Sequence, residues 1–242
     1  MLSIGVLTYN APTTLHHSLN SYKESELLTL TDDFFVVIQM SPRQQEEKGI
    51  CEKFNIRFIL LPDNGNMASG FKSIYENAKY ENILFLENDF IIYKNINDTK
   101  NFYDNCLFFL TKYDVVRGRS RTKPGIPNYA YDLRHTDPSE LIHHHHLAES
   151  IYWLEDPELI YPTKIEKLTH TEILGNEKWY KSTSESCSYT NNPYACSKTF
   201  FKENIYPYLE YGKNIEEQML DVWGKNHKCI FGPGLFTHDR KI

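Results

Sequence analysis

Two carboxylates separated by one residue follow an apolar segment in the first half of the chain. The segment 84–86 (Leu-Phe-Leu) runs directly into Glu87, Asn88 and Asp89. Hard oxygen ligands at the end of a buried strand suit Mg²⁺ or Mn²⁺, and such an ion can in turn hold a diphosphate. A polar strand end in which the aspartate caps a turn would give the same pattern. Both interpretations stay open at this point.

Basic side chains provide further candidate contacts. Arg117, Arg119 and Arg121 alternate along a predicted strand and therefore point to one face, where they could meet phosphates or an anionic acceptor. A solvated strand face explains them equally well. Lys72, on a predicted helix, could contact a phosphate or a base, although a surface lysine also fits its position. Four consecutive histidines, 143–146, cannot all converge on one ion, so we expect no catalytic metal there.

Strands and helices alternate over the first 121 residues. Apolar runs predict strands at 3–9, 34–38, 56–61, 83–86 and 114–121, with helices between them at 13–24, 44–54, 67–78 and 98–112. This order predicts a doubly wound, mostly parallel sheet flanked by helices. Ligands of such sheets bind beyond the carboxyl ends of the strands. The polar residues expected there are Thr8, Tyr9, Asn10, Gln39, Ser41, Asp63, Asn64, Glu87 and Asp89.

The regular alternation stops after residue 121. Residues 122–192 are rich in Pro, Tyr, His and Thr, and we interpret them as irregular insertions over the sheet rather than a separate domain. Short helices are expected there at 139–147 and 163–168. The remaining expected elements are a strand-to-helix transition at 195–208, a helix at 214–225 and a short final strand at 229–231. The sequence therefore predicts a single domain over residues 1–242.

Composition narrows the class of protein. The 242 residues include 26 basic and 32 acidic side chains, a net charge of −6, which argues against a broad nucleic-acid-binding surface. No apolar run is long enough for a transmembrane helix, and the N-terminus lacks the features of a signal peptide. Five cysteines without a CxxC pair indicate scattered thiols in a reducing compartment. We therefore expect a soluble cytoplasmic protein.

Taken together, the motifs resemble glycosyltransferases of the GT-A (Rossmann-like) fold, close to the large inverting family 2. The similarity covers nearly the whole chain, and its motifs occur in the family's order. They are the opening strand with Thr8-Tyr9-Asn10, the turn Asn64-Gly65-Asn66 before a helix, Glu87-Asn88-Asp89 in place of DxD, the acidic pair Glu216-Glu217, and His238. The resemblance implies a nucleotide-sugar-binding half at 1–121 and an acceptor-binding half at 122–242.

The resemblance also implies roles for individual residues. Asp89 matches the direct metal ligand, and His238 matches a residue that supplies another metal ligand in some relatives. The expected donor-binding residues are Thr8, Tyr9 and Asn10, which match the segment that cradles the nucleotide, Asp63 and Asn64, which match the loop at the base or ribose, and Lys72, Glu87 and Asn88. The cofactor implied is Mn²⁺ or Mg²⁺.

The acidic pair Glu216-Glu217 matches the family's catalytic pair, whose second acid is the general base in inverting members. An inverting transfer needs one carboxylate that takes the proton of the acceptor hydroxyl while the sugar is attacked from the opposite face. We therefore favour Glu217 as the base, with Glu216 beside it. An ordinary acidic helix N-terminus, stabilised by the helix dipole, explains the pair without any catalytic role.

These features predict a metal-dependent glycosyltransferase that moves one sugar from a nucleotide-diphosphate donor, with a UDP-sugar favoured, to a hydroxyl of a glycan or other acceptor, with inversion. Two departures from the family stand out. Gln39-Met40-Ser41-Pro42 replaces its usual Asp-Asp-Gly-Ser segment, which removes a common nucleotide contact, and the QxxRW element of processive synthases is missing. The alternatives are a sugar-nucleotide nucleotidyltransferase and a non-catalytic carbohydrate-binding module on a decayed transferase fold.

Overall fold

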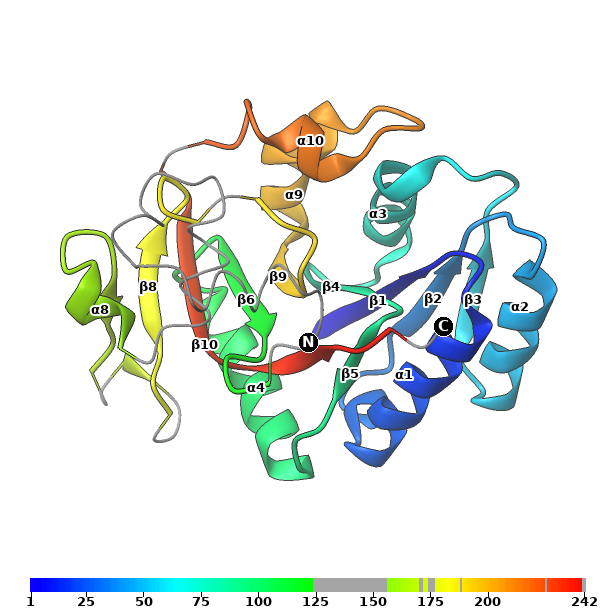
Figure 1. The fold of residues 1–242 in the computed structure, drawn as a ribbon, viewed down its shortest axis with the longest axis horizontal. Coiled ribbons are helices and arrows are strands. Elements are labelled where there is room, and N and C mark those ends of the chain that lie inside the picture. The colour runs from blue at the N-terminus through cyan, green and yellow to red at the C-terminus, as the bar shows by residue number, and fades with distance from the viewer. Residues whose placement is uncertain (124–155, 170–171, 174–176, 188, 225, 241–242) are drawn as a thin grey trace.

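A ten-stranded sheet runs through the molecule with helices on both faces (Figure 1). The computed structural model describes residues 1–123, 156–169, 172–173, 177–187, 189–224 and 226–240. Within them the strand order is β3-β2-β1-β4-β9-β6-β10-β8-β7, and β5 pairs with β10. The α/β single-sheet architecture predicted from the sequence is thereby confirmed. The expected helix at 139–147 and the four histidines at 143–146 lie outside the described residues.

The first half of the sheet is parallel, as predicted. It consists of β1 (Leu2–Thr8), β2 (Phe34–Ile38), β3 (Arg57–Leu60) and β4 (Asn82–Glu87). The connecting helices are α1 (Pro12–Glu24), α2 (Gln44–Lys53) and α3 (Asn66–Asn77). Parallel strands covered by helices on both sides are buried on both faces, which explains the continuous apolar runs of β1, β2 and β4.

The second half of the sheet is mixed. Strand β9 (Tyr194–Ser197) lies antiparallel between β4 and β6 (Val115–Arg119). Strand β10 (Lys228–His238) runs parallel to β6 and antiparallel to β8 (Tyr180–Thr183), which pairs with β7 (Glu166–Lys167). The expected mostly parallel sheet is thus interrupted, because β9 enters between β4 and β6 in the opposite direction and β8 runs antiparallel to β10.

Three local predictions in this half were wrong. Residues 163–168 form a turn and the short strand β7 rather than a helix, and α10 (Ile215–Met219) is shorter than the predicted 214–225. Strand β10 continues beyond 229–231 through Gly232-Pro233-Gly234, with a register shift between Phe231 and Phe236. Gly234 makes this continuation possible: its φ is +64°, and a Cβ there would lie 1.8 Å from the Arg119 carbonyl oxygen.

Two apolar cores separate the sheet from its helical layers. Side chains alternate along each strand, so Val6 faces α1, α2 and α4 (Ile96–Phe109), whereas Leu7 faces α3 on the other side. Helix α9 (Lys198–Asn204) and α10 also belong to the layer on the Leu7 side, with η3 (Tyr206–Tyr208) between them. Figure 1 shows α3, α9 and α10 together on one side of the sheet. The remaining described helices are η1 (Leu27–Thr29) and α8 (Pro157–Ile160).

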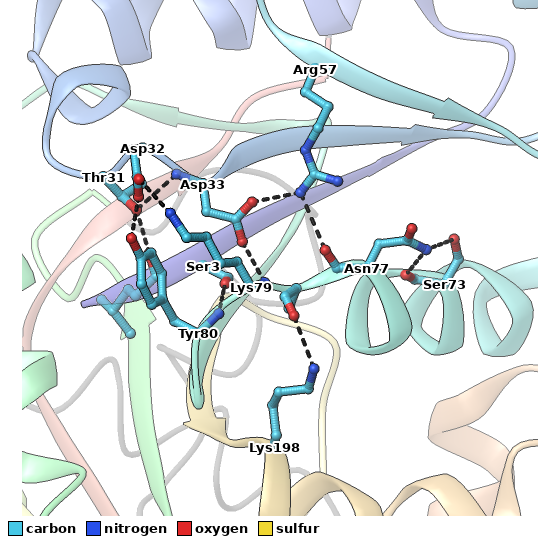
Figure 2. A network of polar contacts seen from close by, with 12 residues as sticks. Ser3, Thr31, Asp32, Asp33, Arg57, Ser73, Asn77, Lys79, Tyr80 and Lys198 are labelled. Carbon is cyan, nitrogen blue, oxygen red and sulfur yellow. Dashed lines mark hydrogen bonds and ion pairs between the residues drawn. The ribbon is translucent and has the colours of Figure 1, made fainter.

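A polar network joins the segments around the amino ends of β1, β2 and β4 (Figure 2). Asp33 is 4% exposed and accepts hydrogen bonds from Arg57 at 2.6 Å and from the Lys79 backbone N–H at 2.7 Å. The Ser3 hydroxyl accepts the Tyr80 backbone N–H at 2.8 Å, and Lys198 donates to the Ala78 carbonyl at 2.9 Å. The network therefore ties β1, β2, β3, α9 and the α3–β4 connection at the edge opposite the strand ends that carry the candidate site.

The described part of the chain contains no helix that is both long enough and apolar enough to cross a membrane. All five cysteines are buried free thiols, as the absence of a CxxC pair suggested.

Candidate active site

The turn after β1 is held by a buried carboxylate that the sequence analysis did not single out. Thr8 is 1% exposed, and its Oγ1 donates to Glu47 Oε1 at 2.6 Å; the Ala11 N–H donates to the same oxygen at 3.0 Å. Burial raises the pKa of Glu47, while the hydrogen bonds from Thr8, Ala11 and Asn10 oppose this rise. Glu47 thus anchors the turn, and Tyr9 and Asn10 project from it into solvent.

Nothing in the sequence distinguishes Glu47 from its neighbour Glu46, since both lie in the first turn of α2. Glu46 pairs with Arg43 in solvent, and the helix dipole also favours an acid in this first turn. Only the packing of α2 against the turn after β1 shows that Glu47 points inward.

The ends of β2 and β3 lie beside this turn. The Gln39 N–H donates to the Thr8 carbonyl at 3.1 Å, and the Met40 N–H donates to the Asp63 carbonyl at 3.2 Å. Gln39 is 3% exposed, and its Oε1 is buried without a hydrogen-bond partner in the described structure. By strand alternation Gln39 points to the same face as Leu7 and α3. Gln39 therefore lies at the position expected for the Asp-Asp-Gly-Ser segment, and its side-chain oxygen is an unused hydrogen-bond acceptor.

Asp63 and Asn64 are exposed, as a loop that meets a ligand requires. Asn64 Oδ1 accepts the Asn66 N–H at 3.0 Å in the turn that begins α3, and Asp63 pairs with the Tyr211 hydroxyl. Lys72 lies one turn and a half into α3, with its Nζ 4.9 Å from the centroid of the Tyr206 ring. This cation–π contact directs Lys72 toward η3, so the structure does not bring it together with the other expected donor residues.

Strand pairing brings Asp89 and His238, which are far apart in the sequence, close together in space. Phe90 of β5 (Phe90–Ile92) is in register with His238 of β10, and the Asp239 N–H donates to the Asp89 carbonyl at 2.7 Å. His238 Nε2 lies 3.0 Å from Asp89 Oδ2, although 149 residues separate them. The two residues expected to hold a metal are therefore neighbours, and backbone hydrogen bonds fix their positions.

Backbone contacts also fix the loop that carries Asn88. Its N–H donates to the Leu7 carbonyl at 3.0 Å, and its carbonyl accepts the Ser18 hydroxyl at 2.5 Å. The Asn88 Nδ2 atom is buried without a hydrogen-bond partner among the described residues. The side chain of Asn88 is therefore an unused donor beside Glu87 and Asp89.

Three acidic side chains share this half-buried region. Burial, followed by the negative charges of Asp89 and Glu216, raises the pKa of Glu87 well above its ordinary value, while Arg240 opposes the rise. Repulsion of this kind between carboxylates is relieved by a bound cation. Glu87 and Glu216 come from β4 and α10, so the site joins both halves of the chain.

Of the acidic pair on α10, the first residue is the one directed into the protein. Glu216 is half-buried, and its Oε1 accepts the Thr190 hydroxyl at 3.0 Å and the Asn191 N–H at 2.7 Å. Glu217 is exposed. The geometry therefore favours Glu216 over Glu217, the residue preferred from the sequence, as the carboxylate that faces the site.

The arginines of β6 do not form the open face considered from the sequence. Arg117 and Arg119 are 2% and 1% exposed. Arg117 donates to the Thr190 carbonyl at 3.2 Å, and Arg119 donates to Asn192 Oδ1 at 2.9 Å. They support the segment 190–192, which in turn holds Glu216. Side-chain burial of this kind cannot be read from the alternation of arginines along a strand.

The donor atoms at Asp89 and His238 fit a divalent cation that shares its coordination with a ligand. Asp89 Oδ1 and His238 Nδ1 are buried and lack hydrogen-bond partners within the described residues. Their contact at 3.0 Å through His238 Nε2 directs Nδ1 away from Asp89, so one ion binds both side chains only by replacing this contact. The described ranges contain no group of three or more His, Cys, Asp or Glu arranged to hold a metal, so these residues alone do not enclose one. Mg²⁺ typically binds one or two carboxylates together with substrate phosphates.

Comparison with solved structures identifies the fold. The structure superposes on residues 1–349 of S. aureus TarS with a TM-score of 0.56 and 16% identity, covering 98% of this chain. It superposes on Mycobacterium tuberculosis glucosyl-3-phosphoglycerate synthase in complex with Mn²⁺, UDP and phosphoglyceric acid, with a TM-score of 0.56, 12% identity and coverage of 100% of this chain and 72% of that one. A complex of that synthase with Mn²⁺, UDP-glucose and phosphoglyceric acid gives a TM-score of 0.54 at 12% identity, with the same coverage.

This chain spans 60% of the length of the TarS fragment. No protein-family model matches the sequence, and no curated protein matches it significantly.

Proposed function

Because the chain has the GT-A glycosyltransferase fold, we propose that it is a metal-dependent glycosyltransferase that moves one sugar from a nucleotide-diphosphate donor to a hydroxyl acceptor. One observation carries the proposal: Asp89 and His238 are paired at the carboxyl edge of the sheet, and the charges of Asp89 and Glu216 both act on Glu87 there. In open α/β sheets this edge is where ligands bind. A UDP-sugar is the favoured donor, and Mn²⁺ or Mg²⁺ the metal, because the synthase structures contain UDP or UDP-glucose together with Mn²⁺.

Asp89 and His238, whose side chains contact each other in this structure, would hold the metal in place of that contact. A divalent cation there would offset the charge that builds on the leaving diphosphate. Glu87 and Asn88 then lie on the donor side, together with Thr8, Tyr9, Asn10, Asp63 and Asn64. We assign residues 1–121 to donor binding and residues 122–242 to acceptor binding, with Glu216 contributed by the second half.

Glu216 is the proposed general base. Its carboxylate takes the proton of the acceptor hydroxyl as that oxygen bonds to the anomeric carbon, while the bond from this carbon to the diphosphate oxygen breaks and the diphosphate leaves with the electron pair. Attack on the face opposite the leaving group gives inversion. The hydrogen bonds from Thr190 and Asn191 hold one oxygen of Glu216 and leave the other for the acceptor.

Donor hydrolysis tests the proposal. UDP- and GDP-sugars are incubated with the wild-type chain and Mn²⁺, and release of the nucleoside diphosphate is measured. We expect release from one or more UDP-sugars and its loss in Asp89→Ala. The control is Asp104→Asn, a change to an exposed aspartate on α4. This helix packs on the face of the sheet opposite the one that α3 and α10 cover. Equal activity in Asp89→Ala and wild type would reject the proposed metal site.

A further inference from the structure

The segment that leads into β9 contains three consecutive buried polar residues, which no local sequence signal indicates. Thr190, Asn191 and Asn192 are 7%, 4% and 8% exposed. Polar side chains are seldom buried to this extent unless their hydrogen bonds are satisfied. Thr190 and Asn192 follow this rule. Thr190 Oγ1 donates to Glu216 and accepts from Asn192 Nδ2, and Asn192 Oδ1 accepts from Arg119.

Backbone contacts fix this segment in place. The Gly118 N–H donates to the Pro193 carbonyl at 2.7 Å, and Arg117 donates to the Thr190 carbonyl at 3.2 Å. The Asn191 N–H donates to Glu216 Oε1 at 2.7 Å. The position of Asn191 is therefore set by main-chain atoms, and a substitution of its side chain leaves the hydrogen bond to Glu216 available.

The side chain of Asn191 is the exception to the rule of satisfied hydrogen bonds. Its Nδ2 lies 3.4 Å from the sulfur of Met67, which is a weak acceptor. Its Oδ1 is buried and has no hydrogen-bond partner in the part of the chain that the structure describes. A buried amide oxygen without a donor destabilises the folded state, so a role in binding explains it better than a role in folding.

Two contacts, made by its Nδ2 atom and its backbone N–H, place Asn191 between the halves of the site. Met67 lies in the first turn of α3, directly after the donor-side turn at Asn64, and Glu216 is the proposed base. Asn191 touches both residues. A sugar positioned for transfer has to lie between the diphosphate and the base, and its hydroxyl groups are hydrogen-bond donors.

We propose that Asn191 determines specificity for the transferred sugar by accepting a hydrogen bond from one of its hydroxyl groups through Oδ1. This inference rests on the proposed function. It assigns Asn191 to the sugar rather than to the nucleotide, so its substitution affects binding of a UDP-sugar and not of UDP.

The test compares UDP with the UDP-sugar that the wild-type chain hydrolyses fastest among UDP-glucose, UDP-galactose and UDP-N-acetylglucosamine. Calorimetry with Mn²⁺ gives both dissociation constants for wild type and for Asn191→Leu, which keeps the side-chain volume and removes the acceptor. We expect the constant for UDP to stay within about 2-fold and that for the UDP-sugar to rise about 3- to 10-fold, the loss of one neutral hydrogen bond. Removal of the unpaired oxygen should leave Tm unchanged or higher.

Two further variants complete the experiment. Asn191→Ala introduces no extra volume and carries the same expectation if Asn191→Leu folds poorly. Asn77→Leu, a change at the other end of α3, should alter neither dissociation constant. Equal changes for UDP and the UDP-sugar, or no change for either, would overturn the inference while leaving the proposed function intact. A wild-type chain that binds neither ligand would overturn both.

Discussion

The buried carboxylate of Glu47 allows a quantitative prediction for the turn after β1. Glu47→Ala leaves the Thr8 hydroxyl and the Ala11 N–H without their acceptor. Each unsatisfied buried donor destabilises the folded state by about 1–3 kcal/mol, and removal of the desolvated charge offsets part of this loss. We expect the free energy of unfolding to fall by about 2–4 kcal/mol, which lowers Tm by about 5–15 °C in a chain of this size.

Glu47→Gln is the matched variant, because its amide oxygen can still accept both hydrogen bonds. We expect its free energy of unfolding to stay within about 1 kcal/mol of wild type near pH 5. The pKa of Glu47 is raised in the folded state, so the folded protein binds the proton more tightly than the unfolded chain. The contribution of Glu47 to stability is therefore full below its ordinary pKa of 4.5 and is lost as the pH rises through the folded value.

Urea unfolding at pH 4.5, 5.5, 6.5 and 7.5 measures both effects. The glutamine variant should gain stability relative to wild type as the pH rises, and this difference should level off above the folded pKa of Glu47. UDP calorimetry on the alanine variant should show weaker binding, since the turn that carries Tyr9 and Asn10 loses its anchor. An alanine variant as stable as wild type, or a difference between glutamine variant and wild type that is independent of pH, would refute this account.

Four other substitutions separate the roles assigned to acidic residues. Asp89→Asn should weaken Mn²⁺-dependent UDP binding more than about 10-fold in calorimetry, because a charged ligand of the cation is lost; unchanged binding would contradict the assignment. Glu216→Gln should lower sugar transfer by about 10²- to 10⁴-fold in a radiolabel assay while UDP binding persists, whereas Glu217→Gln should retain transfer. The reverse result would make Glu217 the base. Asp33→Ala should lower the free energy of unfolding by about 2 kcal/mol in urea and leave UDP binding intact, because its network (Figure 2) lies at the opposite edge of the sheet; a loss of UDP binding at full stability would count against this.

The first four strands were predictable because local sequence determines them. Runs such as Phe34–Ile38 are apolar throughout, and turn residues bound them, so the predicted strand and β2 coincide. The strands after residue 121 could not be predicted in this way. Strand β10 passes through Gly232-Pro233-Gly234, a sequence that normally ends a strand, and it continues because it pairs with β6 on both sides of this segment and with β5 beyond it.

The candidate site likewise contains residues that the sequence indicates and residues that it does not. Glu87 and Asp89 could be found because they directly follow an apolar strand. The choice between Glu216 and Glu217 could not, because it depends on which side of a five-residue helix faces the segment 190–192. Glu47 and Asn191 have no local signal either, since each is defined by contacts with residues distant in the sequence.

Binding of UDP to the wild-type chain tests the central claim most directly. Calorimetry is performed with UDP in the presence of Mn²⁺ and, in a matched titration, with EDTA. The proposed site at Asp89 and His238 predicts binding with Mn²⁺ and a loss of most or all of it with EDTA. Absence of UDP binding under both conditions, or equal affinity with and without the metal, would contradict a metal-dependent glycosyltransferase.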